Sequence, residues 1–127
     1  MDLKIEVQNC EDRVHVTLTG DLTSESAPRL REIATDLEET HASDLPVLVL
    51  SFLDITYIDS AGLGTLVFLH KAWQGRGKPM VILRLSPLAK KFLRTTGLLR
   101  VFHVVETEDD LPAAIERFER ELESTEG

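Results

Sequence analysis

The stretch from Leu45 to Phe52 is almost entirely apolar and rich in Val and Leu. A transmembrane helix needs roughly 20 apolar residues, so this stretch is far too short to span a bilayer. A short, continuous apolar run of this kind is instead typical of a strand that is buried on both faces of a parallel sheet. The sequence therefore predicts an α/β fold in which this segment is the central strand of a mostly parallel sheet.

The residues before this run follow the period of two that is typical of strands. Leu3, Ile5 and Val7 alternate with polar residues, and the alternation resumes at Val14 after a turn-like segment from Asn9 to Asp12. Two alternating segments separated by a short polar turn predict a β-hairpin. We therefore expect the sheet to begin with an N-terminal strand hairpin.

The remaining segments alternate between strand and helix patterns, which predicts about four helices packed against the sheet. Ser86 before Pro87 has the pattern of a helix N-cap, and Thr107 with Asp110 resembles a capping box. No linker interrupts the pattern, so residues 1–127 are expected to form a single domain with a frayed tail from about Glu123. The predicted helices begin at Thr23 or Ser24, Ser60, Pro87 and Thr107, and further strands are predicted at Met80–Leu85 and Val101–Val105.

The charge of the chain limits the partners that it can have. There are 22 Asp and Glu against 14 Lys and Arg, giving a formal net charge of −8. Non-specific binding to nucleic acid or to an anionic membrane requires clustered Lys and Arg, so a protein partner or a small ligand is favoured. The single cysteine, Cys10, excludes a disulfide framework and favours a cytoplasmic location.

Motifs for catalysis, nucleotide binding and metal binding are incomplete in this sequence. Gly62 and Gly64 lack the third glycine of a dinucleotide fingerprint, and Gly77-Lys78 lacks the rest of a phosphate loop. Ser60 lacks the preceding glycine of a hydrolase nucleophile elbow. The four histidines are scattered without metal-ligand spacing. We therefore expect no enzyme activity, no catalytic residue, no metal and no cofactor.

The most informative segment is Asp59-Ser60-Ala61-Gly62-Leu63-Gly64, which opens a predicted helix. One interpretation is purely structural, with Asp59 or Ser60 acting as the helix N-cap. Two glycines in the first turns, however, cost about 1 kcal/mol each relative to alanine. Their small size would be explained by the close approach of another backbone or of a partner protein. The residues alone leave both interpretations open.

At this motif the sequence resembles the STAS (sulfate transporter and anti-sigma factor antagonist) family, specifically its stand-alone bacterial anti-sigma factor antagonists. The resemblance covers nearly the whole chain and rests on several motifs in order. These are Val16–Leu22 with its Gly-Asp-Leu turn, the central strand Val47–Leu50, the segment Ile58–Gly64, and the third-helix region formed by Ser86-Pro87, Lys90–Leu93 and Thr96–Leu98.

The resemblance implies a mechanism of partner switching. The unmodified antagonist would bind a serine-kinase anti-sigma factor, and the kinase would inactivate the antagonist by phosphorylating Ser60. A metal-dependent serine phosphatase would restore the unmodified form. The resemblance places the partner-binding surface on two loops and on the exposed face of the second helix, with the loop residues Asp21, Thr23, Ser24, Asp59, Ser60, Ala61, Gly62, Leu63 and Gly64.

Two residues differ from the usual pattern of these antagonists, and the difference at Thr23 keeps other functions open. Thr23 stands where many antagonists have aspartate, and Ala61 replaces a second hydroxyl residue beside Ser60. One alternative is a non-phosphorylated STAS subunit of a membrane lipid-transport ATPase assembly. A second is a scaffold in a stress-signalling assembly, and whether the chain forms a dimer is left open by the sequence.

Overall fold

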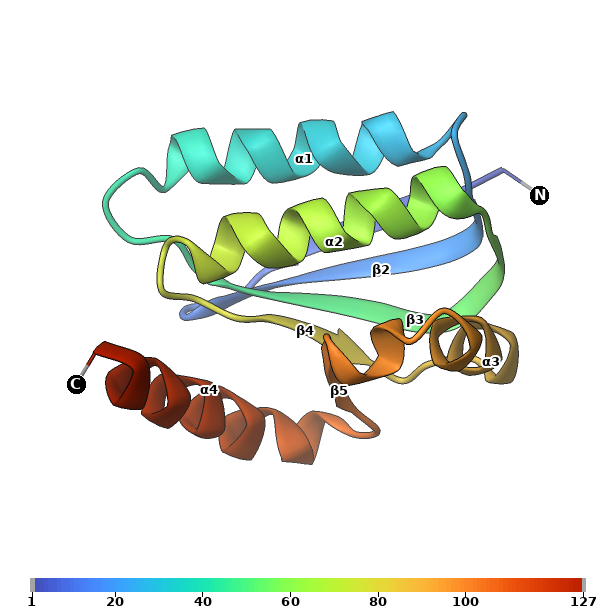
Figure 1. The fold of residues 1–127 in the computed structure, drawn as a ribbon. Coiled ribbons are helices and arrows are strands. Elements are labelled where there is room, and N and C mark those ends of the chain that lie inside the picture. Colours follow the sequence, from blue (N-terminus) through green and yellow to red (C-terminus); the bar gives the residue numbers. More distant parts are fainter. Residues whose placement is uncertain (1, 127) are drawn as a thin grey trace.

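The computed structural model describes residues 2–126, which form one five-stranded sheet with helices on both of its faces (Figure 1). Two short 3₁₀ turns, Leu98–Arg100 and Glu108–Asp110, flank the last strand. In chain order the other elements are β1 (Lys4–Asn9), β2 (Arg13–Leu22), α1 (Ala27–Thr40), β3 (Val47–Ile58), α2 (Ser60–Gln74), β4 (Met80–Leu83), α3 (Pro87–Thr95), β5 (His103–Val105) and α4 (Leu111–Glu126).

The strands lie in the order β1-β2-β3-β4-β5. Strands β1 and β2 form an antiparallel hairpin, whereas every other neighbouring pair is parallel. The predicted fold class is therefore confirmed, including the N-terminal hairpin and the central position of the apolar strand. Because β2, β3 and β4 are parallel, their carboxyl ends and the loops that follow them lie at the same end of the sheet.

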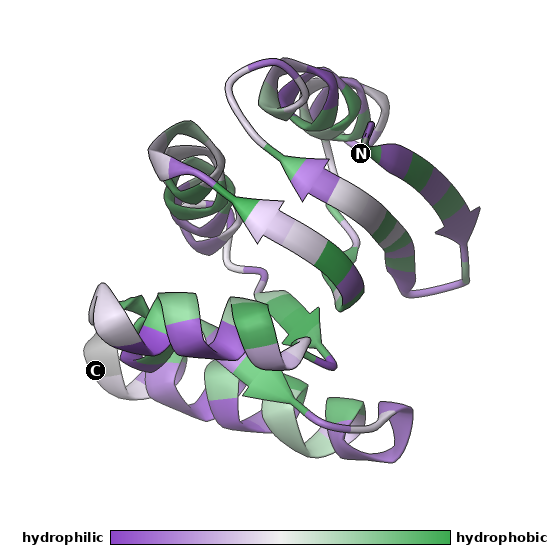
Figure 2. Ribbon diagram, turned by 90° about the vertical axis from the view of Figure 1, so that its right-hand side faces the viewer, coloured by the Kyte–Doolittle hydropathy of each residue, from purple (hydrophilic) through white to green (hydrophobic). Residues whose placement is uncertain are grey.

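Strand β3 is buried on both faces, as its apolar sequence predicts. Leu48, Leu50 and Phe52 belong to the larger core with residues of α1 and α2, whereas Val47 and Val49 belong to a smaller core with residues of α4. Figure 1 shows α1 and α2 on one face of the sheet and α4 on the other. In Figure 2 the strand nearest the N-terminus is mostly hydrophilic, in keeping with its position at the edge of the sheet.

The central strand continues beyond the apolar run from which it was predicted. Residues 54–59 were expected to form a link, but β3 extends to Ile58 along the end of β2. The β2–β3 register shifts twice in this region, between Thr17 and Thr19 and between Gly20 and Asp21. Gly20 has a φ of 109°, which favours glycine at the second irregularity. This extension carries the chain directly into the turn that precedes α2.

Helix α1 begins later than predicted, at Ala27 instead of Thr23 or Ser24. The hydroxyl of Ser26 donates to the carbonyl oxygen of Asp21 at 2.7 Å and accepts from the backbone N–H of Thr23 at 2.9 Å. These bonds close a turn over residues 23–26 and leave Ser26 without a side-chain bond to the helix. The segment after β2 is therefore an ordered loop that lies beside the start of α2.

Helix α3 begins as predicted, because the hydroxyl of Ser86 accepts from the backbone N–H of Ala89 at 3.1 Å. The predicted capping box at Thr107 is wrong. The Thr107 hydroxyl donates to the Asp110 carboxylate at 3.0 Å instead of capping, and a 3₁₀ turn separates these residues from α4.

The C-terminal region differs from the prediction in two places. The segment around Leu98–Arg100 forms a 3₁₀ turn, which shortens β5 to His103–Val105. Helix α4 continues to Glu126, beyond the residue at which fraying was expected, and residue 127 lies outside the described residues. Within residues 2–126, none of the helices is both long and apolar enough to cross a membrane.

Candidate functional site

Asp59 is the residue that organises the start of α2. It is the helix N-cap, in an extended conformation, and its Oδ1 atom accepts from the backbone N–H of Gly62 at 2.9 Å. Its other oxygen, Oδ2, accepts from the backbone N–H of Ser24 at 3.0 Å. The bond from Gly62, with that from Ser24 adding to it, holds the pKa of the Asp59 carboxyl below its ordinary value of 3.8. Asp59 is therefore a fixed negative charge at neutral pH.

The loop after β2 and the turn after β3 are joined by several contacts. The backbone N–H of Asp59 donates to the carbonyl oxygen of Leu22 at 3.2 Å. Near the ends of β2 and β3, just before these loops, the Thr56 hydroxyl donates to Asp21 Oδ1 at 2.6 Å. The sequence predicts that Asp21 approaches this turn only if the strand ends converge, and they do converge. The two loops therefore form one continuous surface.

Ser60 is the first residue of α2, and it is exposed. Because Asp59 supplies the cap, the Ser60 hydroxyl is not required for it. Within residues 2–126 this hydroxyl forms no hydrogen bond. Of the two candidate caps, Asp59 has the structural role, and Ser60 is left as an accessible hydroxyl beside a fixed carboxylate.

The two glycines of the motif have different environments. Gly62 is buried, and a Cβ atom on it would overlap the backbone carbonyl oxygen of Leu22. Gly64 is exposed, and a Cβ atom on it would have nothing within 4 Å. The close approach of another backbone thus explains Gly62. The fold supplies no steric reason for Gly64, which leaves a bare stretch of helix on the surface.

The structure brings all the predicted loop residues to one end of the sheet, but it does not expose them equally. Leu63 is buried in the larger core, so it packs α2 onto the sheet. The Thr23 hydroxyl accepts from the backbone N–H of Glu25 at 3.3 Å and so stabilises its own loop. The exposed members are Ser24, Ser60 and Gly64, the half-buried ones are Asp21, Thr23, Asp59 and Ala61, and the buried ones are Gly62 and Leu63.

The exposed face of α2 continues this surface with an aromatic residue, Phe68. Phe68 lies one helical turn after Gly64 and is 45% exposed. The guanidinium of Arg31, on α1, lies 4.4 Å from the centre of the Phe68 ring, and its Nε donates to the Thr65 hydroxyl at 3.1 Å. Arg31 is 37 positions from Phe68, so nothing in the local sequence pattern indicates this contact.

The chemistry available at this surface also depends on whether it has a metal site or a pocket. No group of three or more His, Cys, Asp or Glu among the described residues is placed to hold a metal ion. The depression beside the loop has a volume of about 510 Å³ and includes Asp21, Ser24 and Tyr57. The arrangement therefore offers an accessible hydroxyl, a fixed carboxylate and a bare helix face.

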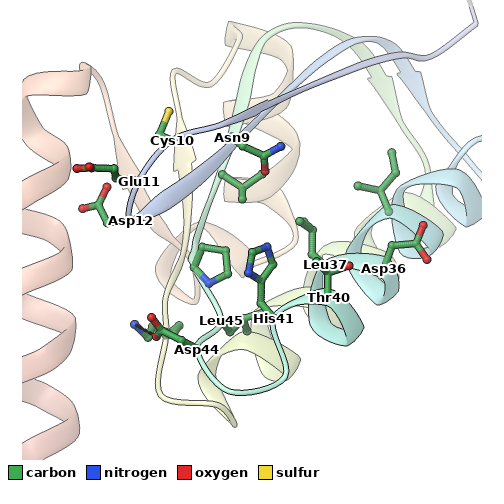
Figure 3. A pocket seen from close by; sticks show the side chains of 14 residues that line it. Asn9, Cys10, Glu11, Asp12, Asp36, Leu37, Thr40, His41, Asp44 and Leu45 are labelled. Carbon is green, nitrogen blue, oxygen red and sulfur yellow. Dashed lines mark hydrogen bonds and ion pairs between the residues drawn. The ribbon is translucent and has the colours of Figure 1, made fainter.

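A larger groove of about 710 Å³ lies at the opposite end of the sheet, between the β1–β2 turn and the end of α1. Figure 3 shows Cys10, Glu11 and Asp12 on the turn, and Asp36 and His41 on the helix side. None of the predicted site residues lines this groove. We therefore assign it no part in the site around Ser60.

The comparisons with known proteins agree on one family. The STAS domain model matches residues 4–111. The anti-sigma-B factor antagonist of Staphylococcus aureus is 30% identical over 106 residues, which are 84% of this chain and 95% of the relative.

Two solved structures show the same fold at low sequence identity. A crystal structure of a putative anti-sigma factor antagonist from Thermotoga maritima has a TM-score of 0.77 at 18% identity, covering 88% of this chain and 94% of that one. The Bacillus cell fate determinant SpoIIAA in its phosphorylated form has a TM-score of 0.64 at 16% identity, covering 88% and 98%. The architecture found here is therefore that of these proteins.

Proposed function

Because the chain belongs to the STAS domain family, as one of its anti-sigma factor antagonists, we propose that it works by partner switching at Ser60. In its unmodified form the chain binds a serine-kinase anti-sigma factor and so frees a sigma factor. The kinase phosphorylates Ser60, which ends the binding, and a serine phosphatase restores it. The chain is thus a regulatory binding module and not an enzyme.

The observation that carries this proposal is the environment of the Ser60 hydroxyl. It is exposed at the start of α2, while the structural work of capping is done by Asp59. A kinase can therefore modify Ser60 without removing a contact that the fold requires. The SpoIIAA protein of Bacillus has a structure in a phosphorylated form, which supports a phosphorylated state for a protein of this fold.

Electrostatics explain why a phosphate at Ser60 would weaken binding. A phosphate adds about −1.5 to −2 charges at neutral pH. Asp59 is ionised beside it and already accepts from the backbone N–H of Gly62, so this donor is not available to the phosphate. The helix N-terminus stabilises the phosphate in part, but a partner surface fitted to a neutral hydroxyl faces charge repulsion and desolvation.

The shape of α2 supports a partner that packs closely against this helix. Ser60, Gly64 and Phe68 are four residues apart and exposed, so they form one stripe along the helix. Gly64 leaves the backbone bare between the modified residue and the aromatic ring. Aromatic residues are common anchors in protein interfaces, and Arg31 already holds the Phe68 ring in place. We assign Ser24 and this stripe to the direct contact surface.

A pull-down from native cell lysate tests the proposal. The baits are the wild-type protein, Ser60→Ala, Ser60→Asp and a control, Ser43→Asp, which adds the same charge at an exposed position at the opposite end of β3. Wild type, Ser60→Ala and Ser43→Asp are expected to retain a kinase-type anti-sigma factor, and Ser60→Asp is expected to lose it.

Two results would contradict the proposal. Equal retention of the anti-sigma factor by all four baits would mean that charge at Ser60 does not control binding. Retention of a transporter ATPase, or of other STAS proteins, in place of a kinase-type anti-sigma factor would favour a transport subunit or a stress-signalling scaffold.

A further inference from the structure

A second groove of about 710 Å³ lies away from the Ser60 surface, where α4 approaches the last turns of α2. Residues of α2, α3, β5 and α4 line it, and none of the residues assigned to partner binding does. The volume falls in the range of about 300 to 1,000 Å³ that is typical of small-molecule sites. The groove is thus large enough for a small molecule and is separate from the proposed switch.

The groove is lined by more cationic than anionic side chains, although the chain as a whole is acidic. Lys90, Arg100 and Arg117 line it, together with two carboxylates, Glu106 and Glu121. The chain as a whole has a net charge of −8. Within the described part of the chain, none of the three cationic side chains forms an ion pair. The charged lining of the groove therefore differs in sign from the chain as a whole, which favours an anionic ligand at this place.

A buried imidazole at the wall of the groove has an unmet hydrogen-bonding group. His70 is 9% exposed, and its Nδ1 atom has no hydrogen-bond partner among residues 2–126. The ring lies edge-on to Phe102 with centroids 5.6 Å apart and is 5.8 Å from the ring of His103. Buried polar groups without partners are uncommon in folded proteins, and a bound water or ligand group is one explanation for such a group.

Burial is the main cause that lowers the pKa values of the two imidazoles in this groove. Burial lowers the pKa of His70, and the charges of His103 and Lys71 lower it further. Burial also lowers the pKa of His103, with Glu121 opposing this effect and Arg117 adding to it. A bound anion would favour the protonated imidazoles and would therefore raise both pKa values.

Part of the groove lining is apolar, and some of it is aromatic. The buried Phe102 and Phe118 line the groove together with Leu99 and Leu122. The His103 ring is edge-on to Phe118 with centroids 5.5 Å apart, so the second imidazole contacts this aromatic lining. A ligand that fits this lining has an apolar or aromatic body as well as an anionic group.

We propose that the groove between α2, β5 and α4 binds a small organic anion, with the anionic group near Arg117, Arg100 and the histidines and the apolar body over Phe102 and Phe118. Phosphate and carboxylate groups share this chemistry. Phenyl phosphate and benzoate therefore serve as the two anionic probes, and benzyl alcohol serves as the neutral one.

The test is a titration of the full chain with each probe, followed by NMR of the imidazole signals. Phenyl phosphate or benzoate is expected to shift the NMR signals of His70 and His103 in a saturable way and to raise the pKa values of these two residues. The signals of His15 and His41 are expected not to shift on addition of either probe. Replacement of Arg117 by Gln is expected to weaken binding about tenfold, which corresponds to one charge-assisted contact.

Arg120→Gln is the matched control, because Arg120 is exposed on the same helix and does not line the groove. The anionic probe is expected to bind this variant as tightly as the wild type. The proposal is overturned if neither anion shifts His70 and His103, if benzyl alcohol binds as well as the anions, or if Arg117→Gln and Arg120→Gln bind alike. Thermal unfolding of both variants checks that they remain folded.

Discussion

Asp59 and Ser24, which are 35 positions apart in the sequence, are joined by a hydrogen bond of 3.0 Å from the Ser24 backbone N–H to the Asp59 carboxylate. The same carboxylate caps α2 through Gly62. One acidic side chain therefore fixes the loop after β2 against the start of α2. Ser60 lies next to this side chain, so a phosphate on Ser60 would place its charge where the two loops are connected.

Asp59→Ala is expected to destabilise the protein at neutral pH by about 1 kcal/mol, the usual cost of losing an N-cap. The folded state lowers the pKa of this carboxyl, so the ionised carboxylate contributes stability above its unfolded pKa. This contribution is lost as the pH falls through the lower folded pKa. Urea unfolding from pH 7 down to pH 2 is expected to show the difference between wild type and Asp59→Ala shrinking below about pH 4.

The exposed Asp54 supplies a control for this titration, through the variant Asp54→Ala. Its effect on the free energy of unfolding is expected to be small at every pH. A cost of Asp59→Ala that stays constant from pH 7 to pH 2 would show that the charge of Asp59 does not stabilise the fold.

Gly62→Ala is expected to destabilise the fold by about 1 to 3 kcal/mol, the usual cost of adding a methyl group to a closely packed site. The added methyl group would overlap the Leu22 carbonyl and push the start of α2 away from β2. Chemical denaturation with a circular dichroism readout measures this change. A variant as stable as the wild type would mean that the close approach of these two segments is not required.

Gly64→Ala is expected to have opposite effects on stability and on binding. The methyl group meets no atom within 4 Å, and alanine is favoured over glycine in a helix by about 1 kcal/mol, so the free energy of unfolding should rise. The affinity for the anti-sigma factor should fall, because the methyl group covers the bare stretch of helix. The free energy of unfolding is measured by denaturation and the affinity by calorimetric titration, on one preparation of the protein. Unchanged affinity would remove Gly64 from the contact surface.

Ser86→Ala is expected to lower the free energy of unfolding by about 1 to 3 kcal/mol, because it removes a helix cap and a buried hydrogen bond to a carbonyl group. The Ser86 hydroxyl accepts from the N–H of Ala89 and donates to the carbonyl oxygen of Ile55 at 3.1 Å in the buried interior. Thr107→Ala is the comparison, since the Thr107 hydroxyl donates to the exposed Asp110 side chain. Thermal unfolding of the two variants should rank them clearly, and equal melting temperatures would contradict this assignment.

Much of the fold follows from periodicity, because burial imposes the pattern directly. The apolar run from Leu45 predicts a strand buried on both faces, and β3 is such a strand. The sequence does not indicate where β3 ends, because the buried residues there are three positions apart and not two. These residues are Phe52, Ile55 and Ile58. The register shifts between β2 and β3 produce this spacing, and no local pattern indicates an irregularity that depends on a neighbouring strand.

The site was predictable in its parts but not in its connections. The sequence indicates that Asp59 or Ser60 caps α2 and that the glycines need close approach of a backbone or of a partner. The bond from Ser24 to Asp59 and the placement of Arg31 over Phe68 depend on how distant elements pack. Local patterns carry no information on such contacts, which is also why they could not separate the role of Gly62 from that of Gly64.

The central claim is that phosphate on Ser60 controls the affinity of the chain for an anti-sigma factor. The most direct measurement is calorimetric titration of the kinase-type anti-sigma factor with the unmodified protein and with the protein stoichiometrically phosphorylated on Ser60. A coupling of about 3 kcal/mol predicts that phosphorylation weakens binding more than a hundredfold. Equal dissociation constants for the two forms would contradict the account and would leave Ser60 as an ordinary first residue of α2.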